Sequence, residues 1–337
     1  MKIRLKALAL MFATFTPCTA GAQQITGAGA TFPAPLYLKW TEEAEPAIGV
    51  QLDYQAIGSG GGQNQILNRS VDFGASDAPM DPEMLDAGDL LQVPTVMGAV
   101  LVIVNIPGIG VNQLKLPDTV VADIYAGRVT NWNDPSIVAA NPGVELPSLV
   151  ITPVHRADSS GTTLVWTSYL CAISPSWMRT TGSGTSVKWP VGARAIGSGG
   201  VAASVRNTAG AIGYVENTYA VQNNLITVQL RNKSGHYVAP SLEAFQAAAS
   251  QADWLGAKNF AVSIINMPGD TSWPIMSATF ILLPKNPQDP AASANVVKFI
   301  DWAYRNGSAI ATSLHYIPLP GVVQDAALAA MTSQIKH

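Results

Sequence analysis

The chain has 337 residues, which is longer than a single hydrophobic core usually supports, so the sequence predicts two domains. With 48% hydrophobic and 12% charged residues it is a folded protein rather than a disordered one. Its net charge of -3 provides no basic surface for a run of phosphates, which excludes nucleic-acid binding.

The N-terminus has the pattern of a secretory signal peptide. Lys2, Arg4 and Lys6 precede an apolar stretch at 7–15, and an A-x-A cleavage site follows at 20–22. We therefore predict a cleaved signal peptide over residues 1–22 and a periplasmic location. The apolar stretch is too short to span a bilayer.

Two cysteines bear on processing and stability. Cys18 raises lipidation as an alternative, but residues 15–17 lack the usual lipoprotein pattern, so plain cleavage is preferred. Removal of the leader leaves Cys171 without a partner for an internal disulfide. We interpret Cys171 as an inert buried thiol on a helix.

Apolar runs and amphipathic stretches alternate along the mature chain. Helical patterns occur at 35–45, 164–171, 241–249 and 291–304, and short β-branched or apolar runs at 100–104 and 280–283 predict buried strands of a largely parallel sheet. Segments 179–200 and 231–240 are rich in turn residues. The alternation predicts an α/β fold.

Four clusters of Gly, Ser, Thr and Asp stand at or near the starts of helical patterns, at 27–33, 58–62, 72–79 and 156–162. A helix N-terminus offers unpaired N–H groups and partial positive charge, and small residues let an anion approach them. The clusters therefore indicate a site for an oxyanion. Taken singly, each is explained as well by helix capping or a turn.

Signatures of other chemistry are missing. The cluster at 27–33 has Phe32 where a dinucleotide motif needs its last glycine, and the chain contains no P-loop. Its four histidines are scattered without the spacing of a zinc site, so we expect no metal and no cofactor. Ser160 lies outside a nucleophile motif, and His155 is interpreted as a surface or strand-end residue. The eight tryptophans are scattered and are expected in the cores.

Taken together, the motifs resemble one family, the phosphate-binding proteins of bacterial phosphate ABC importers (PstS), which have the type II periplasmic binding-protein fold. The resemblance runs from 25 to about 323 and includes 27–35, 71–79, 156–162, 187–190, 211–216, 273–275 and 299–304. Departures are small: Gly60 replaces a frequent Ser, Ser159 a frequent Gly, and His155 a frequent Arg.

The resemblance implies a set of phosphate-binding residues, carried over by position: Thr31, Phe32, Ser59, Asp77, Arg156, Ser160, Gly161 and Thr162. It also implies that Asp158 steadies Arg156.

The resemblance further implies a two-domain α/β architecture with the ligand cleft between the lobes and two hinge crossings. Lobe 1 would comprise 23–104 and 280–337, and lobe 2 would comprise 105–279. The implied function is high-affinity binding of inorganic phosphate in the periplasm and its delivery, by a protein that is monomeric when free, to the permease subunits of an ABC importer with its cytoplasmic ATPase.

The chemistry of these residues fits a tetrahedral anion independently of the family. Arg156 is permanently charged and can bond two oxygens, while Ser59, Ser160 and neighbouring hydroxyl and N–H groups add donors. Asp77 would repel an anion unless the ligand carries a proton. Phosphate does so at neutral pH and sulfate does not, so Asp77 is expected to select phosphate. The structural alternative for Asp77 is a cap or turn before Pro79.

Two other functions are less consistent with the sequence. A binding protein for another oxyanion, such as sulfate or molybdate, is disfavoured by Asp77. A secreted phosphatase is disfavoured because the chain shows neither a metal set nor an activated nucleophile.

Overall fold

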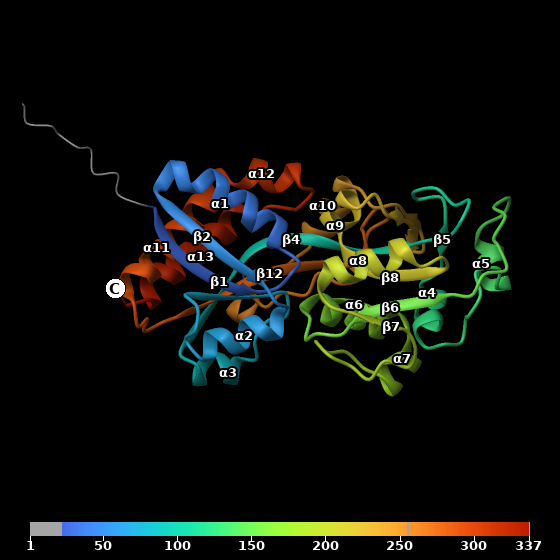
Figure 1. Ribbon diagram of the computed structural model, residues 1–337, viewed down its shortest axis with the longest axis horizontal. Helices are drawn as coiled ribbons and strands as arrows, with labels where there is room; N and C mark the ends of the chain where they lie inside the picture. Colours follow the sequence, from blue (N-terminus) through green and yellow to red (C-terminus); the bar gives the residue numbers. More distant parts are fainter. Residues whose placement is uncertain (1–21, 255, 337) are drawn as a thin grey trace, which may run out of the picture.

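The computed structural model describes residues 22–254 and 256–336. The predicted signal peptide, apart from Ala22, therefore lies outside the described residues, as does Cys18. Figure 1 shows an elongated molecule whose elements gather at two ends. The first and last parts of the chain together form one end, here called the terminal lobe, and the middle of the chain forms the other, the middle lobe.

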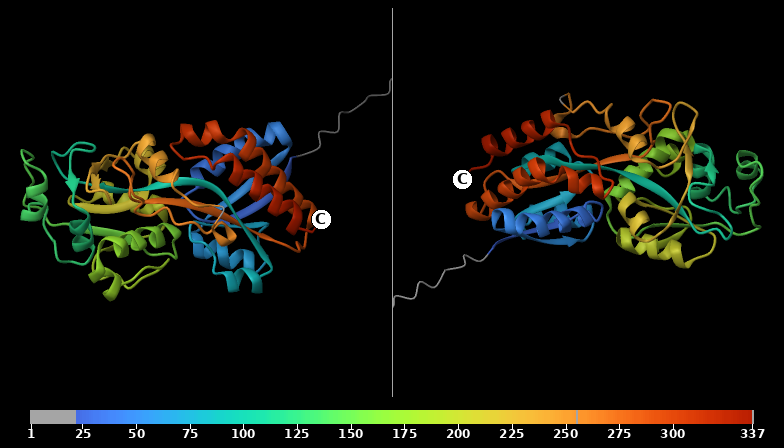
Figure 2. Two further views of the ribbon diagram at one scale, coloured as in Figure 1. Left: turned by 180° about the vertical axis from the view of Figure 1, so that it is seen from behind. Right: turned by 90° about the horizontal axis from the view of Figure 1, so that it is seen from above.

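In the terminal lobe, α1 and α12 lie above the strands in the view of Figure 1, and α2 and α3 lie below them. The elements of this lobe are β1 (Gln23–Gly29), α1 (Ala34–Ile48), β2 (Val50–Ala56), α2 (Ser59–Leu67), β3 (Phe73–Ser76), α3 (Pro82–Ala87), β12 (Met276–Pro284), α11 (Pro290–Asn306), α12 (Ser308–Ser313) and α13 (Gly321–Gln334). The right view of Figure 2 shows the C-terminal helices stacked together over the strands.

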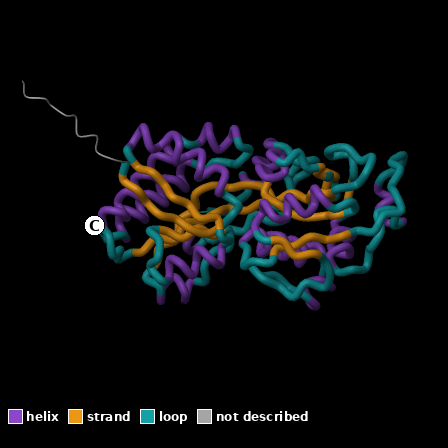
Figure 3. The backbone as a smooth tube through the Cα atoms, in the orientation of Figure 1, coloured by secondary structure: helices purple, strands orange, loops and turns teal. Residues whose placement is uncertain are grey.

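In the middle lobe, short strands are surrounded by helices and long loops (Figure 3). Its elements are β5 (Lys115–Leu116), α4 (Asp118–Tyr125), α5 (Pro135–Ala140), β6 (Thr152–Arg156), α6 (Gly161–Ile173), α7 (Pro175–Thr180), β7 (Ala193–Ala195), α8 (Gly197–Asn207), β8 (Ala211–Glu216), α9 (Asn217–Gln222), β9 (Ile226–Thr227), β10 (Gln229–Arg231), β11 (Tyr237–Val238), α10 (Leu242–Ala249) and the 3-10 helix η1 (Lys258–Phe260).

One long strand connects the two lobes. β4 (Leu90–Val104) is buried at all of its 15 residues. It pairs with β12 from Leu90 to Ala99 and with β8 from Val100 to Val104. The strand order is therefore β2-β1-β3-β12-β4-β8-β6-β7, with β9 also paired to β4, and a separate sheet has the order β11-β10-β5.

The main sheet is mixed, whereas the sequence predicted a largely parallel one. β1 is parallel to β2 and β3, and β6 is parallel to β7 and β8. The two most apolar strands, β4 and β12, are antiparallel to each other and to their outer neighbours. That prediction was wrong because complete burial on both faces produces the same continuous apolar run in either orientation.

An irregularity interrupts the β4–β12 pair. Thr279 pairs with Val96 and Phe280 with Pro94, so Thr95 has no direct partner. Pro94 lacks the N–H group that a regular ladder needs, which accounts for a bulge at this point. The Thr95 hydroxyl donates to the carbonyl of Thr279 at 3.2 Å. On the other side of β12, Phe280 pairs with Ser76 of β3, so Thr279 stands across from Asp77.

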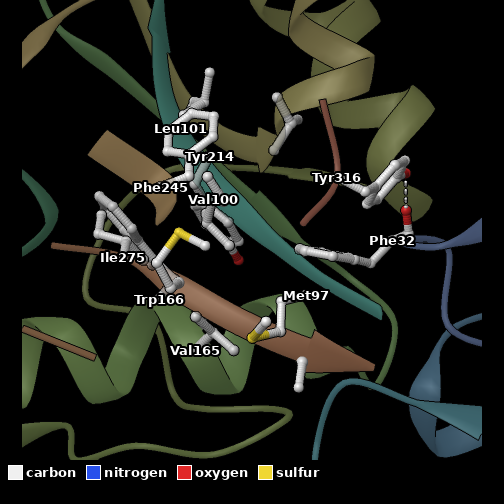
Figure 4. Close-up of a cluster of buried hydrophobic side chains, with 14 of the residues drawn as sticks. Phe32, Met97, Val100, Leu101, Val165, Trp166, Tyr214, Phe245, Ile275 and Tyr316 are labelled. Carbon is white, nitrogen blue, oxygen red and sulfur yellow. Dashed lines mark hydrogen bonds between the residues drawn. The ribbon is translucent and has the colours of Figure 1, made fainter. Parts of the chain in front are cut away.

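The core continues from one lobe to the other along β4. Figure 4 shows Met97, Val100 and Leu101 of β4 close to Trp166 and Tyr214 from the middle lobe, with Phe32 and Tyr316 from the terminal lobe nearby. The predicted helices at 35–45, 164–171, 241–249 and 291–304 are confirmed within α1, α6, α10 and α11. Within residues 22–254 and 256–336, no helix combines the length and apolarity needed to cross a membrane.

A further contact between the lobes was not predicted. η1 packs on β4, and Gln92 donates its side-chain N–H to the carbonyl of Asn259 at 2.8 Å. A cavity of about 370 Å³ beside this contact is lined by Gln92, Asn259 and the terminal helix α13. The chain at 257–260 therefore lies against the terminal lobe, although it precedes the predicted return crossing at 279–280.

Candidate functional site

The candidate site lies where strand ends of both lobes meet. β1 and β3 are parallel neighbours, with Gly29 opposite Ala75, so the residues that follow them emerge at the same edge of the sheet. Thr31 and Asp77 come from these two ends. Arg156 is the last residue of β6 in the middle lobe, and α6 begins five residues later. Such carboxyl ends of strands are the usual place for a ligand in an open α/β sheet.

Arg156 and Asp158 form a buried ion pair. Arg156 is 4% exposed, and its Nε donates to Oδ1 of Asp158 at 2.7 Å while Nη2 bonds the other carboxylate oxygen. Partial burial alone would raise the pKa of Asp158, but the bonds and charge of Arg156 outweigh burial and hold that pKa below its usual value. Asp158 thus fixes the guanidinium and offsets its charge.

The remaining nitrogen of the guanidinium reaches two hydroxyl groups. Arg156 Nη1 lies 3.2 Å from Oγ1 of Thr31 and 3.4 Å from Oγ of Ser198. The two hydroxyl oxygens are 2.8 Å apart. Ser198 was not predicted, because it lies in the segment 179–200 that was interpreted as turns. The pattern that could have indicated Ser198 is a serine between two glycines at the start of a helical pattern.

Ser59 ties the two lobes together. Its hydroxyl accepts from the backbone N–H of Asp77 at 3.1 Å and from that of Gly161 at 3.0 Å. A Cβ at position 161 would lie 2.5 Å from the Ser59 oxygen and 2.6 Å from Cβ of Asp77, so only glycine fits this approach. The cluster at 156–162 therefore needs its glycine for contact between lobes.

Ser160 caps helix α6, since its hydroxyl accepts from the N–H of Thr163 at 3.1 Å. It can still donate its own hydrogen. The N–H groups of Phe32 and Thr162 have no acceptor among the described residues. These N–H groups and hydroxyls are neutral donors on the segments that contain Thr31 and Arg156.

Asp77 is the second carboxylate of the site and is 3% exposed. Its Oδ1 accepts from the hydroxyl of Thr279 at 2.7 Å, and the hydroxyl of Thr162 lies 3.5 Å from Oδ2. Burial raises the pKa of Asp77 from 3.8 to about 7, although these bonds and the charge of Arg156 oppose the rise. At neutral pH the carboxyl group is therefore partly protonated. Thr279, which was also not predicted, reaches Asp77 because it precedes Phe280, which pairs with Ser76 in the antiparallel β3–β12 ladder.

Two tyrosines hold the loop that follows β1. Tyr219 of α9 donates to the carbonyl of Thr31 at 2.7 Å, and Tyr316 donates to the carbonyl of Phe32 at 2.7 Å. Figure 4 shows the second bond. The Phe32 ring itself is buried in the core. The group of Phe32 that is left to serve the candidate site is thus its backbone N–H.

Glu216 is a buried carboxyl group behind this loop, 0% exposed, and was missed by the sequence analysis. Oε2 lies 3.1 Å from the Tyr316 hydroxyl and accepts from the N–H of Thr218 at 2.8 Å. Burial raises the pKa of Glu216 from 4.5 to about 8, although the N–H of Thr218 and the contact with Tyr316 oppose the rise. The folded protein therefore holds a proton here that the unfolded chain releases near pH 4.5.

We expect Glu216→Gln to flatten the pH dependence of stability. Because the pKa of Glu216 is raised in the folded state, the proton on its carboxyl group stabilises the folded protein by several kcal/mol. This stabilisation is complete below about pH 4.5 and is lost as the pH rises through about 8. Glutamine cannot ionise, so urea unfolding at a series of pH values should show a smaller loss between pH 5 and 8. Glu45→Gln, at an exposed position of α1, is the matched control. An unchanged slope would show that Glu216 ionises normally.

His155 is buried, so its interpretation as a surface residue was wrong, although it does lie at the end of β6. Its ring stacks on Trp189 with centroids 4.6 Å apart. Burial holds the pKa of His155 below its usual value, which keeps the ring neutral. Cys171 is only partly buried, and burial raises the pKa of its thiol. Among the described residues, no cluster of three His, Cys, Asp or Glu could hold a metal ion.

The comparisons with known proteins agree with this geometry. Residues 16–306 match the family model of the PBP superfamily domain. The chain is 47% identical over 336 residues to the phosphate-binding protein PstS of Pasteurella multocida, covering 100% of this chain and 97% of that protein. The chain belongs to the PstS family.

A second relative supports membership of the PstS family, and a solved structure supports the fold. The phosphate-binding protein PstS of Haemophilus influenzae is 45% identical over 318 residues, or 94% of this chain and 95% of the relative. The solved structure of a high affinity periplasmic phosphate-binding protein, PfluDING, bound with phosphate, has a TM-score of 0.70 at 21% identity, covering 91% of this chain and 94% of that chain. The predicted α/β, two-domain type II periplasmic binding-protein fold is confirmed.

Proposed function

We propose that this protein binds one inorganic phosphate ion between its lobes in the periplasm and delivers it to an ABC-type import permease with its cytoplasmic ATPase. The observation that carries this proposal is the pairing of neutral donors with one partly protonated carboxyl group. Asp158 already offsets Arg156, so the site has no excess positive charge and must bind an anion through hydrogen bonds. Asp77 adds an acceptor, which a ligand with an O–H group can use.

The proposed phosphate-binding residues are the eight named from the sequence: Thr31, Phe32, Ser59, Asp77, Arg156, Ser160, Gly161 and Thr162. Their closeness in space supports this assignment, because each of them is hydrogen-bonded to another member of the set or next to one in the chain. Asp158 is proposed to steady Arg156. Because Asp77 has a pKa near 7, either it or a monohydrogen phosphate can bring the proton that they share.

We further propose that two lobes, 23–104 with 280–337 and 105–279, close by a hinge motion around the anion. Contacts such as Ser59 with Gly161 and Thr31 with Ser198 join residues more than 100 positions apart across the cleft. Cleavage after Ala22, a monomeric state when free, and recognition of the closed form by the permease belong to the same proposal.

An enzymatic role is not part of the proposal. The best candidate nucleophile, Ser160, uses its oxygen as a helix cap, and the nearest histidine in sequence, His155, is stacked on Trp189. A nucleophile needs an adjacent oriented base, which this arrangement does not provide.

Titration calorimetry on refolded, ligand-stripped protein tests the proposed function. We expect one phosphate per chain and, at about pH 9 where Asp77 is ionised, an affinity for sulfate at least about 100-fold weaker, or ~2.7 kcal/mol, because sulfate has no proton to donate to Asp77. Molybdate provides a second tetrahedral competitor. Equal affinity for phosphate and sulfate would remove the role of Asp77, and absence of phosphate binding would overturn the proposed function.

A further inference from the structure

Ser198 lies at a junction of three chain segments. It is the second residue of α8, is 1% exposed, and its hydroxyl lies between Thr31 of the terminal lobe and Arg156 of the middle lobe. The distances are 2.8 Å to Oγ1 of Thr31 and 3.4 Å to Nη1 of Arg156. The preceding residue, Gly197, donates its N–H to Oδ1 of Asp158 at 3.1 Å. The start of α8 is thus attached to both members of the ion pair.

The hydrogens at this junction can be counted. Nη1 of Arg156 carries two N–H donors, which suffice for the oxygens of Thr31 and Ser198. A hydroxyl has one hydrogen and two acceptor lone pairs. If Ser198 donates to Thr31, the oxygen of Thr31 accepts from Ser198 and from Arg156, and both lone pairs are used. The hydrogen of Thr31 must then point in a third direction, away from both partners.

We propose that Ser198 is a positioning residue that makes Thr31 a dedicated hydrogen-bond donor to the anion and helps hold the lobes together around it. This inference rests on the proposed function. Without Ser198, the hydroxyl of Thr31 keeps one free lone pair and can rotate, so its hydrogen is no longer confined to one direction. The bond of Ser198 to Thr31 also crosses between lobes, and its loss removes one contact that keeps the bound form closed.

The test is a double-mutant cycle in phosphate affinity, measured by calorimetry on stripped protein. Ser198→Ala is expected to weaken phosphate binding about tenfold, the value of roughly one hydrogen bond, and to increase the dissociation rate. Thr31→Val removes the donor itself. In the Thr31→Val background, Ser198→Ala should cost less than about twofold, because its effect acts through Thr31.

Controls separate positioning from general damage. Ser159→Ala removes an exposed serine hydroxyl near the same cleft, which bonds only Thr185 among the described residues, and should leave affinity unchanged. Urea unfolding of ligand-free protein should change little in Ser198→Ala, and Ser198→Thr should restore affinity. If Ser198→Ala misfolds, Ser198→Cys has similar size but is a poor donor, and the same cycle applies.

Two outcomes would overturn the inference. Unchanged affinity in Ser198→Ala would show that Thr31 is oriented without it, and fully multiplicative effects of the two substitutions would show that Ser198 acts independently of Thr31. Both outcomes require that the unsubstituted protein binds phosphate. If it does not bind phosphate, the proposed function fails first, and Ser198 then has no anion-directed role.

Discussion

Arg156→Ala is expected to weaken phosphate binding by about 2 to 5 kcal/mol, the usual cost of truncating one partner of a buried, hydrogen-bonded charge pair. The change removes the only cation that contacts the proposed site among the described residues. It also leaves Asp158 unpaired next to an anion, so repulsion adds to the lost bonds. Calorimetry or competition with a labelled protein would measure the change.

Two variants make the Arg156 prediction specific. Arg194→Ala removes the same charge from an exposed position on the neighbouring strand β7, and its affinity should stay within about twofold because solvent screens exposed charges. Arg156→Ala combined with Asp158→Asn should recover part of the loss, since it removes the unpaired carboxylate. Affinity within a factor of two of the unsubstituted protein in Arg156→Ala would mean that the site is misplaced.

At about pH 8 or above, where Asp77 is mainly ionised, Asp77→Asn is expected to reduce the ratio of phosphate to sulfate affinity by at least about tenfold, or ~1.4 kcal/mol. Asparagine keeps a carbonyl acceptor and adds an N–H donor while removing the negative charge. Phosphate loses a charge-assisted bond of roughly 1.5 to 3 kcal/mol but is also relieved of repulsion, so its affinity should change modestly. Sulfate loses only the repulsion, so its affinity should rise far more.

The raised pKa of Asp77 adds a pH signature to this prediction. In the unsubstituted protein, sulfate binding should strengthen as the pH falls through about 7, because protonation removes the charge of Asp77. Asp77→Asn should abolish this dependence. Asp81→Asn, the same substitution at an exposed helix cap four residues later, should preserve it. Equal weakening of both anions in Asp77→Asn would identify Asp77 as a scaffold residue.

The sequence predicted four short clusters, each local in the chain, and only the resemblance joined them into one site. Arg156, Asp158 and Gly161 lie within six residues, and the resemblance assigned them together. By contrast, Thr279 reaches Asp77 from 202 residues away, because β12 pairs antiparallel with β3 and places Thr279 across from Asp77. No local pattern at Thr279 distinguishes it from other threonines in a buried strand.

The missed features share a physical reason. Ser198 and Glu216 acquire their roles from contacts across the lobes, and buried polar groups of this kind leave no periodic signal in the sequence. The orientation of β4 and β12 was likewise invisible, because an apolar run reports burial but not strand direction. His155 was expected at the surface or at a strand end, and its burial was missed because a single histidine says nothing about a tryptophan 34 positions later.

The bond from Tyr219 to the carbonyl of Thr31 has a consequence for the next amide. That carbonyl and the N–H of Phe32 belong to one rigid planar unit, and in a trans peptide the two groups point in opposite directions. A phenol pulling on the oxygen therefore aims the hydrogen the other way. Tyr219 belongs to α9 in the middle lobe, so this bond joins a donor of the terminal lobe to the opposite lobe. In the proposed closure, the meeting of the lobes would therefore also aim this donor.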